Sequence, residues 1–366
     1  MLKEIKSKYI LVQICSNVNE KLLLKIIKHN KKLKSKLNIS LNDYKNYGKI
    51  VIELIPIEKI DKEQMFINYE EQNESLYHIN FINDEKDAKN DGIIGFFKNL
   101  FKKKNCITQS DNVRKIIIII DNKINSLKGL FKDCICLKEI NFIKFNNNHI
   151  NDMSELFSGC ISLEKLNILK MKTDNVTNMK EMFYKCQKLR TLNLKNFKMN
   201  NVTSMRAMFY GCSALEDLNF LIFDTSNVIQ MNDLFYDCFS LHELNIYNTN
   251  GIYDENEMRI IQDVYPALGD LNIFNFNTSK VTDMSFLFNN CYSLKKFHII
   301  NFDTSHVKVM NRIFMGCKLL GDINLSKFVL KDNTSVFHGF NQCSKSLINN
   351  IKKQIKNINK NAFGGK

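Results

Sequence analysis

The sequence has no tryptophan, only 2 prolines among its 366 residues, and no long apolar run. So few prolines exclude collagen-like proteins and proline-rich linkers. A helix that spans a bilayer needs about 18 to 20 apolar residues, whereas the longest uninterrupted apolar run is Ile116–Ile120. The composition is nevertheless 44% hydrophobic and 11% aromatic, which is enough for a folded core. We therefore expect a folded protein without a transmembrane segment.

Arginine is also scarce, with 5 of the 52 cationic residues. The net charge of +14 would by itself favour a polyanionic partner. Phosphate and base recognition, however, favour the fixed fork of arginine, so nucleic acid is an unfavoured partner. The N-terminal stretch MLKEIKSKYILVQICSNVNEK lacks the apolar core of a secretory signal. We therefore expect a cytoplasmic, reducing location.

The most informative feature is a repeat of 26 residues. Eight of the 11 cysteines follow one another at this spacing, except for one interval of 53 residues. They are Cys134, Cys160, Cys186, Cys212, Cys238, Cys291, Cys317 and Cys343. Methionines and phenylalanines such as Met205 and Phe209 recur in step with them. Because 53 is two periods plus one residue, we predict a ninth, degenerate unit with Tyr265 in the cysteine column.

Each unit combines two periodicities. One apolar stripe has the spacing of a short helix, and in one unit it consists of Val202, Met205, Met208, Phe209 and Cys212. Leu218 and Phe220 then flank Asn219, as in a half-buried strand. No unit can bury both elements alone, so the units must stack. We predict an α/β solenoid, a right-handed array of parallel strands and short helices.

The units resemble those of the BspA-type leucine-rich repeat family. The resemblance rests on the segments FDTSNVIQMNDLFYDCFSLHELNI, FKMNNVTSMRAMFYGCSALEDLNF and FDTSHVKVMNRIFMGCKLLGDINL, and it covers residues 116–345. It implies a leucine-rich-repeat-like fold. That family includes bacterial and protist surface proteins that bind other proteins. The resemblance therefore also implies protein binding and leaves a surface adhesin as an alternative.

The cysteine column can be interpreted as a metal or redox site, or as inert core. Zinc sites use paired C-x2-C motifs with histidine partners, and the one close pair, Cys134 and Cys136, has a different spacing. Consecutive members lie a full turn apart, beside the methionine and phenylalanine stripe. We interpret the column as a ladder of small buried side chains and expect no metal or other cofactor. The methionines and phenylalanines are likewise interpreted as core.

Motifs of common enzyme classes are absent. The seven histidines are scattered, and the sequence contains no H-E-x-x-H, no G-x-S-x-G and no P-loop. A carboxylate cluster at Asp84, Glu85 and Asp87 is interleaved with lysines and has no distinctive partner. The chain is therefore not expected to be an enzyme.

The expected strands carry a polar column that must face outward, because its apolar neighbours point inward. The column comprises Asn167, Asn193, Asn219, Asn245, Asn272 and His298. An outer row follows two residues later, and its candidate partner-binding residues are Leu221, Tyr247, Phe274 and Ile300. The amides can also serve structure alone, by bonding to one another along the ladder. The predicted function is non-catalytic protein–protein interaction through this inner strand face.

We divide the chain into four parts. Residues 1–45 are expected to form a helical segment with weak similarity to an F-box, which leaves a ubiquitin-ligase substrate adaptor as an alternative function. Residues 46–115 are expected to form an α+β region with a charged loop at 84–111. Residues 116–345 are assigned to about nine repeat units, whose first strand begins at the isoleucine run and needs cover from upstream residues. Residues 346–366 are assigned to a basic cap.

Overall fold

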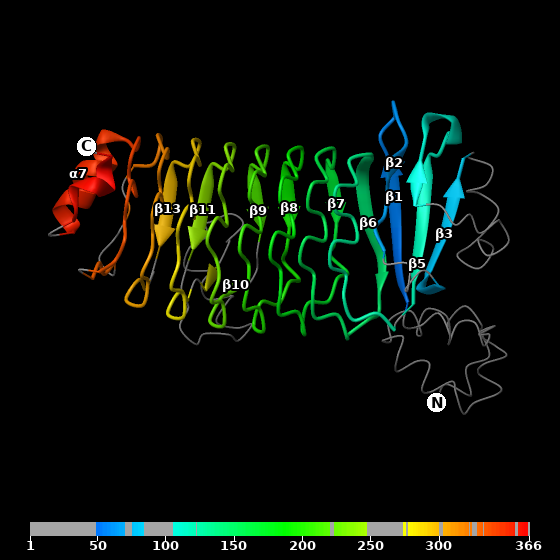
Figure 1. Cartoon of the computed structure of the whole chain (residues 1–366), viewed down its shortest axis with the longest axis horizontal. Coiled ribbons are helices and arrows are strands. Elements are labelled where there is room, and N and C mark those ends of the chain that lie inside the picture. The colour runs from blue at the N-terminus through cyan, green and yellow to red at the C-terminus, as the bar shows by residue number, and fades with distance from the viewer. Residues whose placement is uncertain are drawn as a thin grey trace, which may run out of the picture.

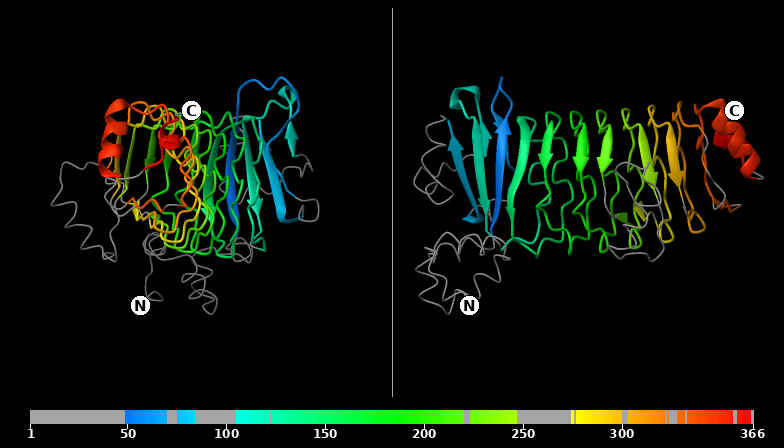
Figure 2. Two further views of the ribbon diagram at one scale, coloured as in Figure 1. Left: turned by 60° about the vertical axis from the view of Figure 1, so that its left-hand side comes forward. Right: turned by 180° about the vertical axis from the view of Figure 1, so that it is seen from behind.

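The computed structural model describes residues 49–69, 75–83, 105–121, 123–219, 223–246, 274–275, 277–299, 303–321, 323, 328–331, 333–355 and 358–364. Their strands form one long row, with β3 near one end and helix α7 at the other (Figure 1). Two further views show the same succession of stacked turns from other sides (Figure 2). The expected F-box-like segment lies outside the described residues. No described helix is long and apolar enough to cross a bilayer.

An antiparallel sheet forms the N-terminal end of the row. Its strands are β1 Ile50–Pro56, β3 Tyr77–Ile82 and β5 Lys115–Ile120, and β5 lies between β3 and β1. A small pair, β2 Gln64–Met65 and β4 Cys106–Ile107, and the 3-10 helix η3 Gln109–Asp111 lie in the connections. The isoleucine run therefore belongs to this sheet. The sequence analysis placed the first strand of the repeat array at this run, and that assignment was wrong.

The central position of β5 explains its continuous apolar sequence. Ile116, Ile118 and Ile120 are fully buried in the main core on one face of the sheet. Ile117 and Ile119 are buried in a second cluster on the other face. Both faces are covered, so the usual alternation of apolar and polar residues is lost. The strands that flank β5, β1 and β3, are the upstream cover that the sequence led us to expect.

The repeat array begins with β6 Leu137–Phe145, which has different partners on its two edges. One edge pairs antiparallel with β1, and the other pairs parallel with β7 Lys165–Asn167. The later strands are β8 Thr191–Asn193, β9 Asp217–Asn219, β10 Phe223–Asp224, β11 Glu243–Ile246, β12 Phe274–Asn275 and β13 Lys296–Ile299. Parallel pairs join β8 to β9, β10 to β12 and β11 to β13. Strand β1 thus covers the edge that the first turn would otherwise expose.

Each turn also contains a segment of eight residues, which we call the turn segment. The turn segments are Leu127–Cys134, Met153–Cys160, Met179–Cys186, Met205–Cys212, Met231–Cys238, Met284–Cys291, Met310–Cys317 and Val336–Cys343. The sequence predicted a short helix here, but all eight are successions of tight turns. The third and seventh residues of every turn segment have a positive φ, between 51° and 80°. Two left-handed residues in eight are incompatible with an α-helix.

The backbone hydrogen bonds explain this conformation. In the turn segment Met205–Cys212, the amides of Met205, Ala207, Phe209 and Gly211 donate to carbonyl oxygens of the next turn at 2.7–3.0 Å. The amides between them, such as that of Met208, donate within their own turn segment to the residue three before. A helix would direct every amide along its own axis. Alternation instead satisfies the buried backbone while tying each turn to the next.

The turn segments enclose two columns of buried side chains. Eight phenylalanines stack with ring centroids 5.3–5.9 Å apart, and they are Phe131, Phe157, Phe183, Phe209, Phe235, Phe288, Phe314 and Phe340. Seven cysteine thiols donate to the carbonyl oxygen of the phenylalanine one turn earlier, with Sγ–O distances of 3.0–3.2 Å. Cysteine fits this position because it is small, apolar and able to donate.

The long cysteine interval does not add a turn to the stack. The amides of Asp233 and Phe235 donate directly to the carbonyls of Ser285 and Leu287, both at 2.9 Å. Phe235 stacks on Phe288 at 5.4 Å. The expected ninth unit is therefore absent from between these turn segments, and the described array has eight. Residues 247–273, which include Tyr265, lie outside the described residues.

The C-terminal residues continue the ladder and cover its end. The amides of His338 and Phe340 donate to Asn361 and Ala362, both at 2.8 Å, beside the 3-10 helix η4 Lys360–Phe363. Helix α7 Lys345–Gln354 is capped by the Ser344 hydroxyl, and it buries two side chains, Leu347 and Ile351. A terminal element that buries apolar side chains covers the exposed end of a stacked array.

Candidate binding surface on the strands

The structure brings the predicted polar column into one row. Asn167, Asn193 and Asn219 are the last residues of β7, β8 and β9. Asn193 is aligned with Asn219, and Asn245 of β11 is aligned with His298 of β13. The row therefore passes directly from Asn245 to His298. The sequence analysis had predicted a position for Asn272 between them.

The outer row of candidates is mostly outside the described part of the chain. Leu221, Tyr247 and Ile300 all fall there, as does Asn272 of the polar column, so the structure does not place them. Phe274 is the first residue of β12, and this strand pairs with β10 rather than with the β11–β13 pair. The same outer position is occupied in earlier turns by Leu169 and Lys195, both exposed. The described outer row thus combines an apolar and a cationic side chain.

The asparagine amides have a local structural role where their side chains are described. The Asn167 Oδ1 atom accepts from the Leu169 amide at 3.3 Å, and Asn193 Oδ1 accepts from the Lys195 amide at 3.1 Å. Such a bond to the backbone two residues later forms an Asx turn, which ends the strand. At these two positions the amide bonds to its own chain segment, not along the ladder.

Charged side chains in or immediately before the strands pair between neighbouring turns. Lys165 contacts Glu139 at 2.9 Å, and Arg190 contacts Glu216 at 3.0 Å. All four side chains are at least one quarter exposed. Exposed pairs contribute about 0 to 1 kcal/mol each, so they add little stability. Their effect is to leave this part of the surface with balanced charge.

A depression of about 380 Å³ lies where the antiparallel sheet meets the array. Its lining comes from β1 and from three successive array strands, and includes Glu53, Glu139, Lys165, Asn167 and Thr191. The sequence analysis missed the contribution of β1, because it depends on the antiparallel pairing of β1 with β6. The alternating segment IVIELIPI was the available signal, since Glu53 lies between two fully buried residues. We call β1, β6, β7, β8 and their outward side chains the strand surface.

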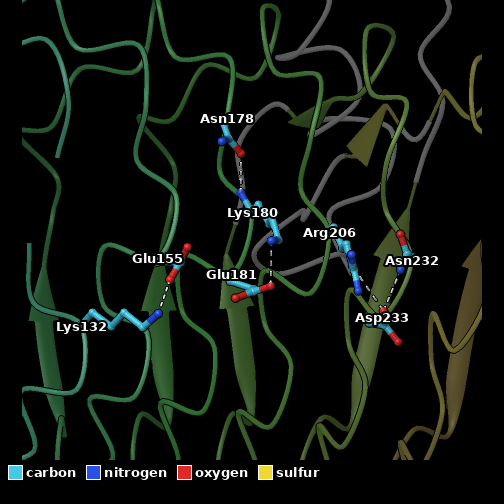
Figure 3. Close-up of polar contacts among 8 residues, drawn as sticks. All are labelled: Lys132, Glu155, Asn178, Lys180, Glu181, Arg206, Asn232 and Asp233. Atoms are coloured by element: carbon cyan, nitrogen blue, oxygen red, sulfur yellow. Dashed lines mark hydrogen bonds and ion pairs between the residues drawn. The ribbon is translucent and has the colours of Figure 1, made fainter. Parts of the chain in front are cut away.

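Polar side chains on the turn segments contact one another (Figure 3). Lys132 pairs with Glu155 of the next turn, and this hydrogen bond lowers the pKa of the Glu155 carboxyl. Arg206 lies 3.8 Å from Asp233, whose pKa is nevertheless raised because burial disfavours its charged form. Tyr210 stacks on the tyrosines before and after it at 4.7 and 4.5 Å. These polar and aromatic side chains therefore find their partners on neighbouring turns of the array.

The cysteine column does not have the chemistry of a reactive site. Burial raises the pKa of the Cys212 thiol to about 12, so it stays protonated at neutral pH. A protonated thiol is neither a good nucleophile nor a metal ligand. Within the described residues, no group of three or more His, Cys, Asp or Glu side chains could hold a metal ion.

The family comparison is consistent with the boundaries of the array. Residues 125–248 and 243–356 each match the model of one family, described as "Mycoplasma protein of unknown function, DUF285". The two matches meet at β11, immediately before residues 247–273. Neither a curated protein nor a solved structure matches the sequence. Because the two matches together cover well over half of the chain, it belongs to the DUF285 family.

Proposed function

We propose that the chain is a non-catalytic protein–protein interaction module that binds a partner through the strand surface. In this proposal the array is a solenoid of the leucine-rich-repeat type, similar to BspA-type repeats. The observation that carries it is the run of outward side chains on consecutive turns. Lys165, Asn167, Leu169, Thr191 and Lys195 are all exposed and differ in chemistry from turn to turn.

The contrast with the turn segments supports the proposal. There, most backbone amides and the buried columns are committed to the stack. On the strand surface, a rigid row of backbone presents side chains that the fold does not require to be of one kind. Repeat proteins commonly bind through such an extended surface, because each turn contributes side chains at a fixed spacing.

We also propose a reducing compartment such as the cytoplasm. The ten described cysteines are all free thiols. Seven of them serve as hydrogen-bond donors inside the array, a role that a disulfide would abolish. Free buried thiols are typical of proteins from reducing compartments.

Site-specific photo-crosslinking in cells tests the binding proposal. A photoreactive phenylalanine analogue replaces Leu169 on the strand surface, which is 42% exposed, or Ile229, which is 49% exposed and lies at another corner of the turn. We expect a discrete crosslinked protein from position 169 and none from 229. Equal products from both positions, or none from position 169, would contradict the proposal.

A second set of variants tests which side chains matter. The strand-surface variant combines Lys165→Glu, Leu169→Ser and Thr191→Lys. The matched control combines Lys308→Glu, Ile229→Ser and Thr282→Lys, which lie in one column two residues before their turn segments and are also exposed. We expect the first variant to lose capture of the crosslinked protein and the control to retain it. Equal retention would show that binding occurs elsewhere.

A further inference from the structure

A larger groove lies beside the strand surface, where the chain leaves β7 and β8. Its volume is about 1090 Å³, and residues 169–175 and 195–200 supply most of its lining. Leu169 and Lys195 belong both to this groove and to the outer row of the strand surface. A partner on the strand surface would therefore reach the groove without a gap. We call it the lysine groove.

The groove is cationic. Lys170, Lys172, Lys195 and Lys198 line it, and all four are exposed. Lys198 pairs with Asp174 at 2.6 Å, and this contact lowers the pKa of the Asp174 carboxyl. The other three lysines form no ion pair within 4 Å in the described part of the chain. Their charge is available to a ligand.

Two of these lysines occupy a position where other turns have a structural acceptor. Asp224, Asn277 and Asp303 accept from the amide two residues later, at 2.8–3.0 Å. Lys172 and Lys198 stand at the equivalent positions, 52 and 26 residues before Asp224. An ammonium group cannot accept a hydrogen bond, so these two turns lack that Asx turn. Lys198 pairs instead with Asp174 of the preceding turn, whereas Lys172 has neither that turn nor an ion pair in the described part of the chain.

The floor of the groove is apolar and fixed. Met171 and Phe197 are buried, while Leu169 is 42% exposed. The Asn196 amide group donates to the Leu169 carbonyl at 2.7 Å and so joins the two lining segments, and the Asn175 amide group donates to the Asn148 carbonyl of the preceding turn, also at 2.7 Å. An exposed leucine between free ammonium groups suits a ligand that is both acidic and partly apolar.

We propose that the lysine groove binds a polypeptide segment of the partner in which aspartate or glutamate residues alternate with apolar ones. This inference rests on the proposed function and specifies the partner's chemistry. A nucleic acid fits less well, because the groove lining contains no arginine and its one aromatic residue, Phe197, is buried. The cationic stretch is also short, since Asp224 lines the groove on the next turn.

Fluorescence anisotropy with the purified full chain tests this inference. The probe is a labelled peptide of alternating glutamate and leucine. The groove variant combines Lys170→Glu, Lys172→Glu and Lys195→Glu. The control combines Lys295→Glu, Lys308→Glu and Lys331→Glu, which makes the same change in net charge at exposed positions outside the groove. Thermal melting followed by circular dichroism verifies that both variants fold.

We expect the groove variant to lose at least about tenfold in affinity and the control less than about twofold, with binding weakened by salt. Equal losses would reveal non-specific attraction and overturn the inference, as would no binding by the unchanged chain. Stronger groove-dependent binding of a single-stranded oligonucleotide or of phosphatidylserine vesicles would also overturn it. The assay needs no cellular partner, so failed crosslinking at position 169 would refute the strand-surface proposal separately.

Discussion

The turn segments and the strands of this array obey different rules, although each turn contains both. The turn segments stack without interruption, through seven parallel β-bridges in register from Ser126 to Ser335 and through one continuous column of phenylalanines. The strands are only two to four residues long after β6, and their pairing is divided among separate sheets. The comparison indicates that the turn segments hold the array together, which leaves the strands free to vary in their outward side chains.

The largest expected effect comes from a hole in the phenylalanine column. Phe209→Ala removes a fully buried ring from between Phe183 and Phe235. We expect a loss of about 3 to 5 kcal/mol in the free energy of unfolding, measured by urea denaturation. The control is Asn193→Ala on the strand surface, which removes one bond to the Lys195 amide and should cost about 1 kcal/mol. Equal losses of unfolding free energy in the two variants would contradict the distinction between the turn segments and the strands.

The cysteine column predicts sensitivity to alkali. The raised pKa of Cys212, about 12, lies above that of an unfolded thiol, about 8.5. The folded state therefore binds the thiol proton more tightly than the unfolded state. The contribution of this thiol to the free energy of unfolding is fully present below about pH 8.5 and falls as the pH rises toward 12. Cys212→Ala should lessen this fall while lowering stability at pH 7. The measurement is urea denaturation from pH 7 to 10, and an unchanged slope would contradict the assignment.

The left-handed positions predict opposite effects for two exchanges in one turn segment. Gly211 has φ 70°, so Gly211→Ala should destabilise the fold by about 1 to 2 kcal/mol. Ala207 has φ 51°, so Ala207→Gly should relieve strain and raise the melting temperature. Thermal unfolding of the two variants measures both shifts. A helical turn segment would instead be weakened by the new glycine and strengthened by the new alanine.

The smallest expected effect comes from the longest change. Deleting the 27 residues 247–273 joins Ile246 to Phe274 and shortens the interval from Cys238 to Cys291 from 53 to 26. The turn segments on either side are already bonded directly to each other. We therefore expect stability to change by less than about 1 kcal/mol, because loop-closure entropy changes by only about 0.6 kcal/mol for each doubling of loop length. Deleting the regular unit 201–226 as a control removes one stacked turn, and an equally mild effect there would show that the array tolerates any deletion.

Much of the fold could be predicted from the repeat period, but not which copy of a duplicated motif is used. Leu244-Asn245-Ile246 and Leu271-Asn272-Ile273 have the same residues, 27 positions apart. Periodicity counts both as strands of successive units. The structure pairs the first with β13, and one slot beside that strand accepts one copy. In the described row Asn245 is aligned directly with His298, with no position between them.

The sequence predicted which strand side chains face outward, but it did not predict which parts of the chain make up the candidate surface. The outward orientation of Asn167 and Asn193 followed from the alternation of apolar residues, while their Asx-turn bonds depended on backbone geometry after the strand. The contribution of β1 and the convergence of Lys170, Lys172 and Lys195 required contacts between residues far apart in the sequence or on successive turns. The repeat spacing alone does not predict how the chain bends where it leaves each strand, and so it does not predict which side chains meet there.

By itself, the sequence determined the period, the buried columns and the need to stack, because a 26-residue unit cannot bury its own apolar side chains. Only the tertiary structure decided how the units join. Each amide in a turn segment can bond within its own turn or to the next, and the choice depends on a neighbour that the local sequence does not contain. The same dependence turned an apparent helix into alternating turns and eight turn segments into one continuous core.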